Sequence, residues 1–355
     1  MIQNVLARLL LAPISLLYGL GVSLRNFFYS SNLLKEVNFD LPIISVGNLS
    51  IGGAGKTPHI EYLIRMLGPY INLATLSRGY NRKTKGYLKV VHSHSVEEVG
   101  DEPLQYLRKF PGVMVYVSES RTFAVPRMIM EYPEMQTVLL DDAYQHRSIL
   151  PGLNILLTDY SLPYTRDYLL PSGRLREWRS ASKRADIIIV SKCPQNLELA
   201  ERDKMVAELS PLPNQRVFFS YYQYLNPYYI FNLRQQVVLN KDLDILLICA
   251  IARTDYLLDY LDSAVNEVQV LEYEDHHYFT KFDVSNLLNR FNNMESKKKL
   301  ILTTEKDAVR LEMHREFILE NKLPILVLPL KVAFLFEDGQ RFDSEVKNFL
   351  LNFKI

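Results

Sequence analysis

Short apolar runs rich in β-branched residues recur along the chain, between segments of mixed polarity. Runs of this kind, bounded by turn residues, predict buried strands. The first series covers residues 43–46, 73–76, 113–117, 137–140, 154–158 and 187–190. A second series starts near Asp244 and covers residues 245–249, 267–271, 299–302 and 325–329, followed by a predicted helix over 344–353. The pattern predicts an α/β fold, and 355 residues suffice for two domains with separate cores.

Two aromatic-rich extended runs lie between the two series of strands. They cover residues 216–225 and 228–233 and are separated by Asn226-Pro227. Turn residues between two extended runs are typical of a β-hairpin. We therefore expect a hairpin here, and it is a candidate for the connection between the domains.

Residues 1–30 form an apolar segment in which Arg8 and Arg25 are the only charges. The uninterrupted part, residues 9–24, contains Pro13 and two glycines and is shorter than the roughly 20 residues of a membrane span. We expect one helix or a pair of helices in the membrane interface, with the arginines at headgroup level and the aromatic residues 27–29 at the boundary. The alternative is an ordinary N-terminal helix packed on the core.

Charge and cysteine content narrow the class of protein. The formal net charge is +1, because 41 basic residues nearly balance 40 acidic ones. Nucleic-acid-binding proteins usually carry a strong basic excess, so nucleic acid is not expected as the main partner. The two cysteines, Cys193 and Cys249, have no metal-like spacing. A reduced compartment without a disulfide framework is the simplest interpretation.

The most informative stretch is residues 42–63, where an apolar strand leads into a glycine-rich loop and then Lys56-Thr57-Pro58. Strand, loop and helix in this order are the architecture of a phosphate-binding P-loop. Glycines let successive backbone N–H groups point at phosphate oxygens, and the positive helix end adds to the attraction. Lys56 is expected to reach the β- and γ-phosphates, and the Thr57 hydroxyl to bind Mg²⁺. The predicted nucleotide-binding residues are Ser50, Ile51, Gly52, Gly53, Ala54, Gly55, Lys56 and Thr57.

Two details depart from familiar nucleotide-binding patterns. The usual P-loop begins with a glycine where this chain has Ser50, so we expect Gly52 and Gly53 to supply the turn. Guanine-specific proteins place an Asp two residues after a Lys such as Lys192, and here that residue is Pro194. The missing Asp favours ATP over GTP. The alternative for the whole stretch is a plain turn before a helix.

The strand predicted over residues 137–140 ends in Asp141 and Asp142. Acids at the end of a strand downstream of a P-loop resemble a Walker B element, in which an aspartate holds magnesium directly or through water. Together with Thr57 they predict a Mg²⁺ site, and His146 follows just beyond it. The sequence leaves open which of the two aspartates contacts the metal.

Four arginines in polar segments after predicted strands are candidates for anion contacts: Arg78, Arg121, Arg174 and Arg176. Arg78 follows the strand over residues 73–76, and strand ends are where a doubly wound sheet meets its ligands. Arginine clusters near a phosphate site suggest anion recognition. The alternatives are a solvated turn, a surface position, or ion pairs with acids such as Glu177.

Two further groups of ionisable side chains lie beside predicted elements. Asp101 and Glu102 precede a helix predicted over residues 103–110, a place where acids are common as caps. His276 and His277 follow Asp275, but no third ligand lies at a spacing that suggests zinc. A general acid–base role or a solvated turn is the preferred interpretation of the histidines.

Taken together, these motifs resemble the tetraacyldisaccharide 4'-kinase family, the enzymes that phosphorylate the lipid A precursor. The resemblance spans most of the chain, and several motifs in one order are more specific than any one of them. Its motifs are residues 47–49, 52–58, 77–80, 100–103, 141–146, 173–177, 275–277 and 303–307. Ala143 replaces a glycine common in the family, and residues 250–253 are a poor copy of its Gly-Ile motif.

The resemblance implies a P-loop NTPase-like α/β/α sandwich plus a second, smaller α/β/α domain, joined by a two-stranded linker, with the active site in the cleft between them. It also favours an N-terminal helix that contacts the membrane. The expected segments are a membrane-interface helix over 1–30, the P-loop kinase domain over 31–215, the linker over 216–240 and the C-terminal domain over 241–355.

For function, the resemblance implies transfer of the γ-phosphoryl group of ATP, with Mg²⁺, to the 4'-hydroxyl of an acylated glucosamine disaccharide 1-phosphate. Asp101 is expected to act as base with His276 in support, beside Lys56, because an ordinary aspartate is a weak base. The candidate substrate contacts are Asn48, Arg78, Arg121, His146, Arg174 and Arg176. A peripheral protein at the cytoplasmic face of the bacterial inner membrane is expected, with a monomer favoured.

Two other interpretations stay open at this point. One is a P-loop kinase of a soluble metabolite, for which residues 1–28 would be dispensable. The other is a membrane-associated nucleotide switch that binds a protein partner and hydrolyses nucleotide slowly. The missing guanine signature and the pairing of Asp101 with His276 count against the switch.

Overall fold

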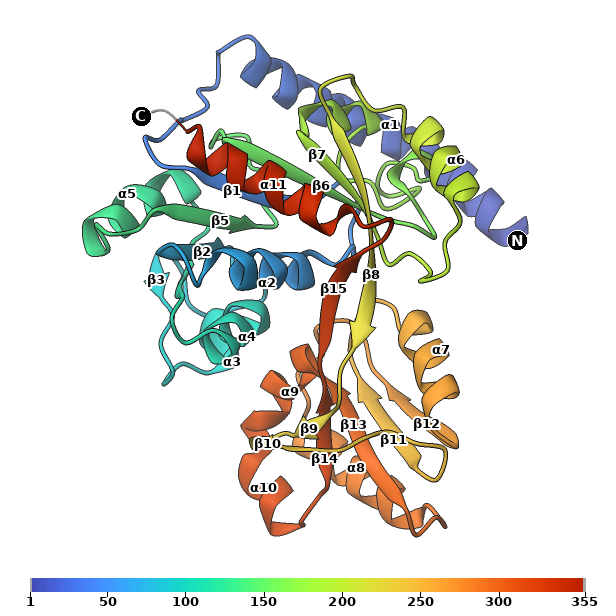
Figure 1. The fold of residues 1–355 in the computed structure, drawn as a ribbon. Coiled ribbons are helices and arrows are strands. Elements are labelled where there is room, and N and C mark those ends of the chain that lie inside the picture. Colours follow the sequence, from blue (N-terminus) through green and yellow to red (C-terminus); the bar gives the residue numbers. More distant parts are fainter. Residues whose placement is uncertain (1, 354–355) are drawn as a thin grey trace.

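The computed structural model describes residues 2–353, with side chains from residue 8 onward. Within these residues the strands form two separate sheets, an upper and a lower one in Figure 1. The upper sheet has nine strands in the order β15-β8-β7-β6-β1-β5-β2-β4-β3, and the lower has six in the order β10-β9-β14-β13-β11-β12. The predicted α/β class is confirmed.

Every strand predicted from the apolar runs is present, with bounds shifted by one or two residues. The upper sheet contains β1 (Ile43–Asn48), β2 (Leu73–Ser77), β3 (Leu88–Lys89), β4 (Met114–Val117), β5 (Thr137–Asp141), β6 (Leu153–Asp159), β7 (Ile187–Ser191), β8 (Arg216–Tyr224) and β15 (Leu330–Phe334). The lower sheet contains β9 (Tyr228–Tyr229), β10 (Asn232–Gln236), β11 (Asp244–Cys249), β12 (Glu267–Glu272), β13 (Lys299–Thr304) and β14 (Ile325–Leu328).

The helices connect these strands or flank them. They are α1 (Ile2–Ser30), α2 (Lys56–Leu67), α3 (Val96–Val99), α4 (Asp101–Lys109), α5 (Arg121–Glu131), α6 (Leu199–Leu209), α7 (Asp255–Ala264), α8 (Lys281–Asn293), α9 (Glu305–Leu311), α10 (Arg315–Glu320) and α11 (Asp338–Leu351). Some begin with side-chain caps, as in α8, where the Thr280 hydroxyl accepts from the backbone N–H of Asp283.

Strand β1 lies at the centre of the upper sheet, parallel to β5 on one side and β6 on the other. All six of its residues are buried, as expected for a parallel strand covered on both faces. Val46 lies opposite Asp141, and its carbonyl accepts from the backbone N–H of Asp142 at 3.0 Å. The parallel register thus brings the P-loop and the acidic end of β5 to the same edge of the sheet.

The hairpin expected over residues 216–233 is wrong. Strand β8 instead pairs in parallel with β7 and antiparallel with β15, which comes much later in the chain. After Asn226-Pro227 the chain enters the lower sheet, where Tyr229 pairs with Leu326 of β14. The two chain crossings between the sheets are therefore β8 and β15 (Figure 1). The turn residues predicted the bend correctly. They could not predict that the distant strand β15 provides hydrogen-bond partners for the backbone of β8.

The C-terminal helix also differs from its expected place. Helix α11 packs on the upper sheet and not on the second domain, to which we assigned residues 241–355 (Figure 1). Phe342 and Val346 are buried in the same core cluster as Ile44 and Phe218. The reason is that β15 returns the chain to the upper sheet, where the apolar face of α11 covers the remaining apolar surface.

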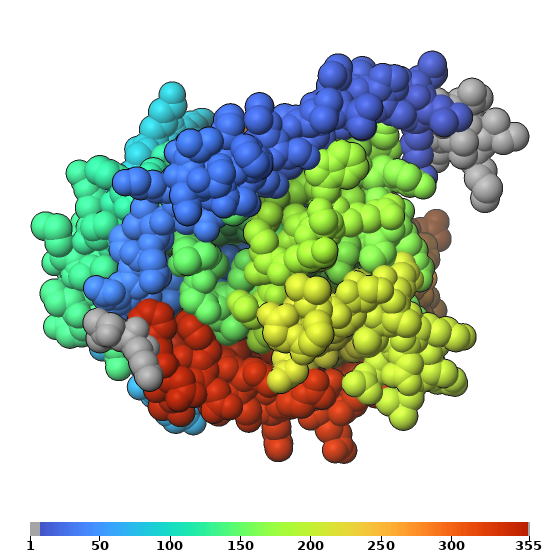
Figure 2. Space-filling view, turned by 90° about the horizontal axis from the view of Figure 1, so that it is seen from above, coloured from blue at the N-terminus to red at the C-terminus, as the bar shows by residue number. Residues whose placement is uncertain are grey.

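Helix α1 lies across one face of the molecule, over the segment that follows β6 (Figure 2). The Ser15 hydroxyl donates to Ser172 Oγ at 2.8 Å, and the Trp178 indole N–H donates to the Gly19 carbonyl at 3.1 Å. A Cβ on Gly19 would lie 2.4 Å from the Trp178 ring, so this close approach requires glycine.

The opposite face of α1 is apolar and exposed, which excludes the alternative of an ordinary core helix. The exposed side chains include Leu9, Leu10, Leu17, Leu20 and Phe27, at 58–76% of their accessible surface. The helix is continuous through Pro13, so the two-helix alternative is wrong. By length and composition, Arg8–Ser30 is one helix that could cross a membrane, longer than the segment that we expected from the interruptions.

Candidate active site

The P-loop turn depends on two glycines in the left-handed region of backbone space. Gly52 has φ 101° and Gly55 has φ 87°, conformations that other residues rarely adopt. A Cβ on Gly55 would also lie 2.4 Å from the Tyr222 hydroxyl. Of the two glycines expected to supply the turn, Gly52 has this conformation and Gly53 does not. Ser50 replaces the usual glycine without strain, since its φ is not positive either.

Lys56 lies at the end of β5, the strand that carries the predicted Walker B acids. Its ammonium group lies 3.2 Å from Asn48 Oδ1 and 3.7 Å from Asp142 Oδ1. Arg176 also donates to both carboxylate oxygens of Asp142, at 3.0 and 3.1 Å. Burial by itself raises the pKa of Asp142, but Lys56 and Arg176 outweigh it, and the pKa falls below its ordinary value. Asp142 is thus an anion with two cationic partners.

Asp141 is fully buried and has an incomplete set of partners. The Tyr106 hydroxyl donates to its Oδ2 at 2.9 Å, whereas Oδ1 has no hydrogen-bond partner within the described residues. Burial, followed by the charge of Glu102, raises the pKa of Asp141 to about 7. An unsatisfied buried carboxylate oxygen is costly unless a further group binds it. A divalent cation is the group that would satisfy it.

The oxygen ligands expected for Mg²⁺ are present at this point. Thr57 Oγ1 donates to Glu102 Oε1 at 3.3 Å, close to the Walker B acids. Among residues 2–353 there is no cluster of three or more His, Cys, Asp or Glu side chains suited to a metal. A P-loop magnesium uses a hydroxyl, one or two carboxylates, water and substrate phosphates.

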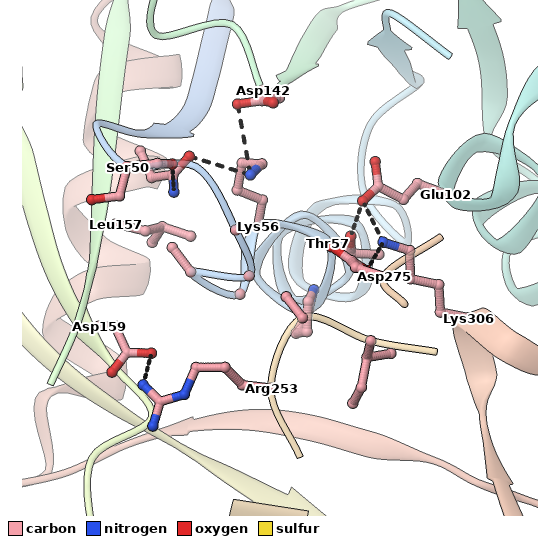
Figure 3. Close-up of a pocket in the computed structure, with 18 of the residues that line it drawn as sticks. Ser50, Lys56, Thr57, Glu102, Asp142, Leu157, Asp159, Arg253, Asp275 and Lys306 are labelled. Atoms are coloured by element: carbon pink, nitrogen blue, oxygen red, sulfur yellow. Dashed lines mark hydrogen bonds and ion pairs between the residues drawn. The ribbon is translucent and has the colours of Figure 1, made fainter. Parts of the chain in front are cut away.

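A cavity of about 1000 Å³ opens between the two sheets, and side chains from both line it (Figure 3). Two predicted site residues, Asp101 and Arg121, do not line it. From the predicted set it is lined by Asn48, residues 50–57, Arg78, Asp141, Asp142, His146, Arg174, Arg176 and His276. The fold therefore gathers nearly all of these residues, from distant parts of the chain, around one space large enough for a nucleotide.

Asp101 and His276 form a pair across the two sheets. His276 Nδ1 lies 3.0 Å from Asp101 Oδ2, although Asp101 begins α4 under the upper sheet and His276 follows β12 of the lower sheet. Asp101 is nearly buried behind the cavity wall, at 5% exposure, and the backbone N–H of Glu102 donates to its Oδ1 at 2.9 Å. Burial opposes its ionisation, but Lys306 and His276 outweigh burial and hold the pKa of Asp101 well below its usual range.

The four arginines occupy different environments. Arg78, Arg174 and Arg176 line the cavity, and Arg174 pairs with Asp167 at 3.2 Å. Arg121 is 1% exposed and donates to the backbone carbonyls of Ser118 and Asp141, at 3.2 and 3.4 Å. The expectation that Arg121 contacts substrate is therefore not met here, because its guanidinium lies behind the Walker B strand and supports its end.

His146 lines the cavity, and nearby arginines affect its ionisation. Burial, then Arg121 and Arg78, lower its pKa to about 4. Its imidazole is therefore neutral near pH 7. A neutral imidazole offers one donor and one acceptor to a bound ligand.

Glu102, Lys306 and Arg253 are cavity residues that the sequence analysis did not assign to the site. Lys306 Nζ lies 3.4 Å from Glu102 Oε1, the same oxygen that accepts from Thr57 (Figure 3). Arg253 reaches across the sheets to Asp159 at 3.5 Å. Glu102 and Lys306 lie inside the family motifs at residues 100–103 and 303–307. Those motifs pointed to the right segments but did not show that these two side chains line the cavity.

Comparison with known proteins agrees with this geometry. The family model described as tetraacyldisaccharide-1-P 4'-kinase matches residues 7–350. The chain is 40% identical to the tetraacyldisaccharide 4'-kinase of Flavobacterium johnsoniae over 97% of this chain and 98% of that one. It is 38% identical to that of Bacteroides thetaiotaomicron, over 95% and 91%.

This chain belongs to the tetraacyldisaccharide 4'-kinase family. Its fold matches the crystal structure of LpxK from Aquifex aeolicus in complex with ATP, with a TM-score of 0.73 and 27% identity over 97% of this chain and 99% of that one. The family resemblance and the P-loop kinase fold expected from the sequence are both confirmed.

The two departures from the family motifs have simple structural accounts in this 4'-kinase family member. Ala143 has no positive φ, so its position does not need glycine. The backbone N–H of Ala250 donates to the Asp307 carboxylate at 3.2 Å, and the Ala250 carbonyl accepts from the backbone N–H of His276 at 3.2 Å. The altered segment 250–253 therefore still positions His276 through its backbone.

Proposed function

We propose that this protein is an ATP-dependent kinase that transfers a phosphoryl group to the 4'-hydroxyl of the tetraacyldisaccharide 1-phosphate precursor of lipid A. The observation that carries the proposal is family membership over residues 7–350, together with the cavity that the P-loop lines with His276, the partner of Asp101. ATP as donor is supported by the ATP complex of the related LpxK.

Lys56 and the loop backbone supply the charge stabilisation in this proposal. In a loose phosphoryl-transfer transition state, negative charge spreads over the transferred oxygens, and catalysis depends on positioning and electrostatics. Lys56 now lies between Asn48 and Asp142, at 3.2 and 3.7 Å. Bound phosphates would draw the ammonium group from Asp142, and Arg176 would still neutralise that carboxylate.

Mg²⁺ is the cofactor that the donor set fits, with Thr57, Asp141 and Asp142 as the residues that would hold it. Bound there, the ion would supply positive charge that neutralises the charge developing on the phosphates. The unpartnered Oδ1 of Asp141 supports this assignment.

Asp101 is the proposed base for the acceptor hydroxyl, with His276 as its partner. His276 lines the same cavity as the P-loop, so an acceptor bound beside the pair would share that cavity with the phosphates. Asp101 and His276 come from different sheets, so the pair exists only when the sheets are close together. Closure of this kind limits water access and wasteful ATP hydrolysis.

The exposed apolar face of α1 supports attachment to a lipid surface, and we assign the protein to the cytoplasmic face of the bacterial inner membrane. Arg25 of α1 lines the cavity, and the Tyr18 hydroxyl donates to the Arg176 carbonyl at 2.9 Å. A helix embedded in the membrane would therefore hold the cavity next to the headgroups, where an acylated sugar resides. Because one chain supplies every proposed site residue, we favour a monomer.

The test is transfer of labelled γ-phosphate from ATP to the acylated disaccharide 1-phosphate in detergent micelles. Wild type, Lys56→Ala and Asp101→Ala are compared, with the exposed Lys298→Ala as a matched control. We expect a labelled lipid from wild type and the control, reduced at least a hundredfold in the two site variants. Magnesium-dependent ATP binding without any lipid product would reject the proposal and favour a soluble acceptor or a nucleotide switch.

A further inference from the structure

We propose that Arg25 of α1 and Arg78 form a second phosphate subsite, which binds the 1-phosphate of the acylated disaccharide and selects acceptors that carry it. The inference rests on the proposed kinase function, because it assigns a place to one part of that acceptor. The acceptor carries its own phosphate at one end of the disaccharide and the reacting 4'-hydroxyl at the other. A cavity that serves this reaction therefore needs two places for anions, one for ATP and one for the 1-phosphate.

The cavity contains two guanidinium groups that no carboxylate neutralises. Five arginines line it, and three of them pair with carboxylates at 3.0–3.5 Å: Arg174, Arg176 and Arg253. Among the residues that the structure describes, Arg25 and Arg78 pair with no carboxylate, and both are exposed. A guanidinium group is always charged, and its planar fork of N–H donors matches a phosphate. An anion is therefore the partner that this part of the cavity lacks.

Arg25 and Arg78 act on the same neighbour, His146. After burial, three arginine charges lower the pKa of His146, those of Arg121, Arg78 and Arg25. Arg25 Nη2 also donates to the backbone carbonyl of Gln145, the residue before His146, at 2.9 Å. The neutral imidazole thus adds an N–H donor close to two guanidinium groups. These groups come from α1, from the turn after β2 and from the segment after β5, so the fold brings them together.

Gln145 stands between this subsite and the P-loop. Its side-chain N–H donates to the Asn48 carbonyl at 2.9 Å, whereas its backbone carbonyl accepts from Arg25. Asn48 Oδ1 in turn lies 3.2 Å from the ammonium group of Lys56. Lys56, the proposed partner of the ATP phosphates, and Arg25 are thus connected through two intervening residues. Each cation can hold a phosphate of its own.

The turn that carries Arg78 also reaches the reacting end of the acceptor. Tyr80 packs its ring on the imidazole of His276, with centroids 4.8 Å apart. Gly79 has φ 69°, a left-handed conformation that turns the chain tightly between Arg78 and Tyr80. All three of Arg78, Tyr80 and His276 line the cavity. A disaccharide that lies along this turn would have its 4'-hydroxyl near His276 and its 1-phosphate near Arg78.

Helix α1 holds Arg25 at the depth where a lipid phosphate would lie. Tyr18, two turns earlier on the same helix, donates from its hydroxyl to the Arg176 carbonyl at 2.9 Å, which ties α1 to the cavity wall. The Tyr29 ring lies 5.5 Å from the Arg25 guanidinium. With the apolar face of α1 in the lipid surface, acyl chains would remain in the lipid while the phosphate that they accompany reaches Arg25.

The first test needs no variant. Wild-type protein in neutral-detergent micelles, which contain no other lipid phosphate, receives labelled ATP and either the acylated disaccharide 1-phosphate or the same lipid without its 1-phosphate. We expect kcat/KM to be at least about tenfold higher for the 1-phosphate, because hydrogen bonds between charged groups are lost without it. Equal use of the two acceptors would overturn the subsite. A wild-type enzyme that labels neither lipid would instead overturn the proposed function.

The second test asks whether Arg25 and Arg78 cause this preference. We expect Arg25→Gln and Arg78→Gln each to raise the KM for the 1-phosphate acceptor about tenfold, with kcat and the KM for ATP within about twofold of wild type. With the acceptor that lacks the phosphate, each variant should match wild type within about twofold. Arg25→Lys should keep part of the preference, because lysine binds phosphate as a point charge without the fork.

Arg8→Gln is the matched control, because Arg8 is an exposed arginine of the same helix that does not line the cavity. Its preference for the 1-phosphate acceptor should equal that of wild type. An equal loss with both acceptors in Arg25→Gln would mean that this arginine contacts the micelle or supports α1, and would overturn the proposal. A higher KM for ATP with an unchanged preference would assign the arginines to the nucleotide and overturn it as well.

Discussion

Lys109 of α4 lies 2.6 Å from Glu305 of α9, and its ammonium group is also 2.6 Å from Glu61 of α2. Both carboxylates are nearly enclosed, at 9% and 2% side-chain exposure. One cation thus joins the P-loop helix to the first helix after β13 of the lower sheet. Glu305 directly precedes Lys306, so this contact also sets the distance between Lys306 and the upper sheet.

Replacement of Lys109 by Met should destabilise the protein. It would leave the buried Glu305 without a cation and Glu61 with Arg65 alone, and breaking a buried pair in this way costs about 3–5 kcal/mol. Urea unfolding followed by circular dichroism measures the loss. Lys83→Met is the matched control, because Lys83 pairs with Glu97 at 70% exposure, and exposed pairs contribute about 0–1 kcal/mol. Equal effects of the two substitutions would contradict the importance of the buried contact.

Glu305 should make stability depend on pH. Burial, followed by the charge of Glu61, raises its pKa to about 7, above the value of about 4.5 in the unfolded chain. Because the folded pKa is raised, the folded state favours the protonated form, and this contribution is lost as pH rises from about 4.5 through 7. Glu305→Gln should therefore gain stability relative to wild type between pH 5 and pH 8. Thermal unfolding at both pH values checks this, with the exposed Glu134→Gln, expected to show no such trend, as control.

Gly55→Ala should weaken nucleotide binding strongly. The position combines φ 87° with a Cβ that would lie 2.4 Å from the Tyr222 hydroxyl, so the loop must move. We expect the Kd for ATP, measured by calorimetry with Mg²⁺, to rise more than tenfold, equivalent to at least about 1.4 kcal/mol. Adding Tyr222→Phe should restore part of the affinity, because it removes the collision but not the backbone strain.

The control for that prediction is Gly112→Ala. No atom of the described chain lies within 4 Å of a Cβ at Gly112, and its φ is not positive. Its affinity for ATP should match wild type. A Gly55→Ala protein with normal affinity would mean that the loop does not need this conformation.

Asp141→Asn should raise the Mg²⁺ concentration required for half-maximal activity at least tenfold. The amide keeps the shape of the side chain but removes the charge of the buried carboxylate whose Oδ1 has no partner among the described residues. Carboxylate oxygens are the ligands that Mg²⁺ prefers, and an amide is weaker. Titration of activity with MgCl₂ measures the shift, with the exposed Asp203→Asn as control. An unchanged requirement would remove Asp141 from the proposed metal site.

The double substitution Leu17→Glu/Leu20→Glu should weaken attachment to lipid vesicles. These side chains are 70% and 58% exposed on α1, and burying a leucine contributes about 1.5–3 kcal/mol. Co-sedimentation with anionic phospholipid vesicles should show a loss of affinity of more than tenfold. Leu233→Glu, 67% exposed on β10 of the lower sheet, should bind vesicles like wild type. Equal binding by all three proteins would contradict membrane attachment through α1.

Much of this protein could be predicted from its sequence because the signals are local. The strands around the P-loop and the Walker B acids appear as short apolar runs that end in glycines or aspartates, and the structure moves their bounds by only one or two residues. The glycine-rich loop was predicted from the sequence, whereas the left-handed φ of Gly55 and its close approach to Tyr222 became visible only in the structure.

Pairings between distant segments were decided by the tertiary structure. The hairpin predicted at Asn226-Pro227 is instead a crossing between sheets, because β15 offers β8 a longer run of backbone partners than its neighbour in sequence. The sequence left Arg121 as either a surface residue or a phosphate contact. In the structure its side chain is buried behind β5 and donates to the Asp141 carbonyl, so it is neither.

By itself, the sequence determined the α/β class, the nucleotide loop, the acidic strand end and the family, since each depends on residue order within a short segment. Tertiary structure decided which side chains meet. Asp101, His276 and Lys306 are far apart in the chain, and their contacts of 3.0 and 3.1 Å exist because β8 and β15 hold one sheet against the other. Ionisation depends on such contacts, because a pKa is set by the nearest charges and hydrogen-bond partners in space and not by neighbours in sequence.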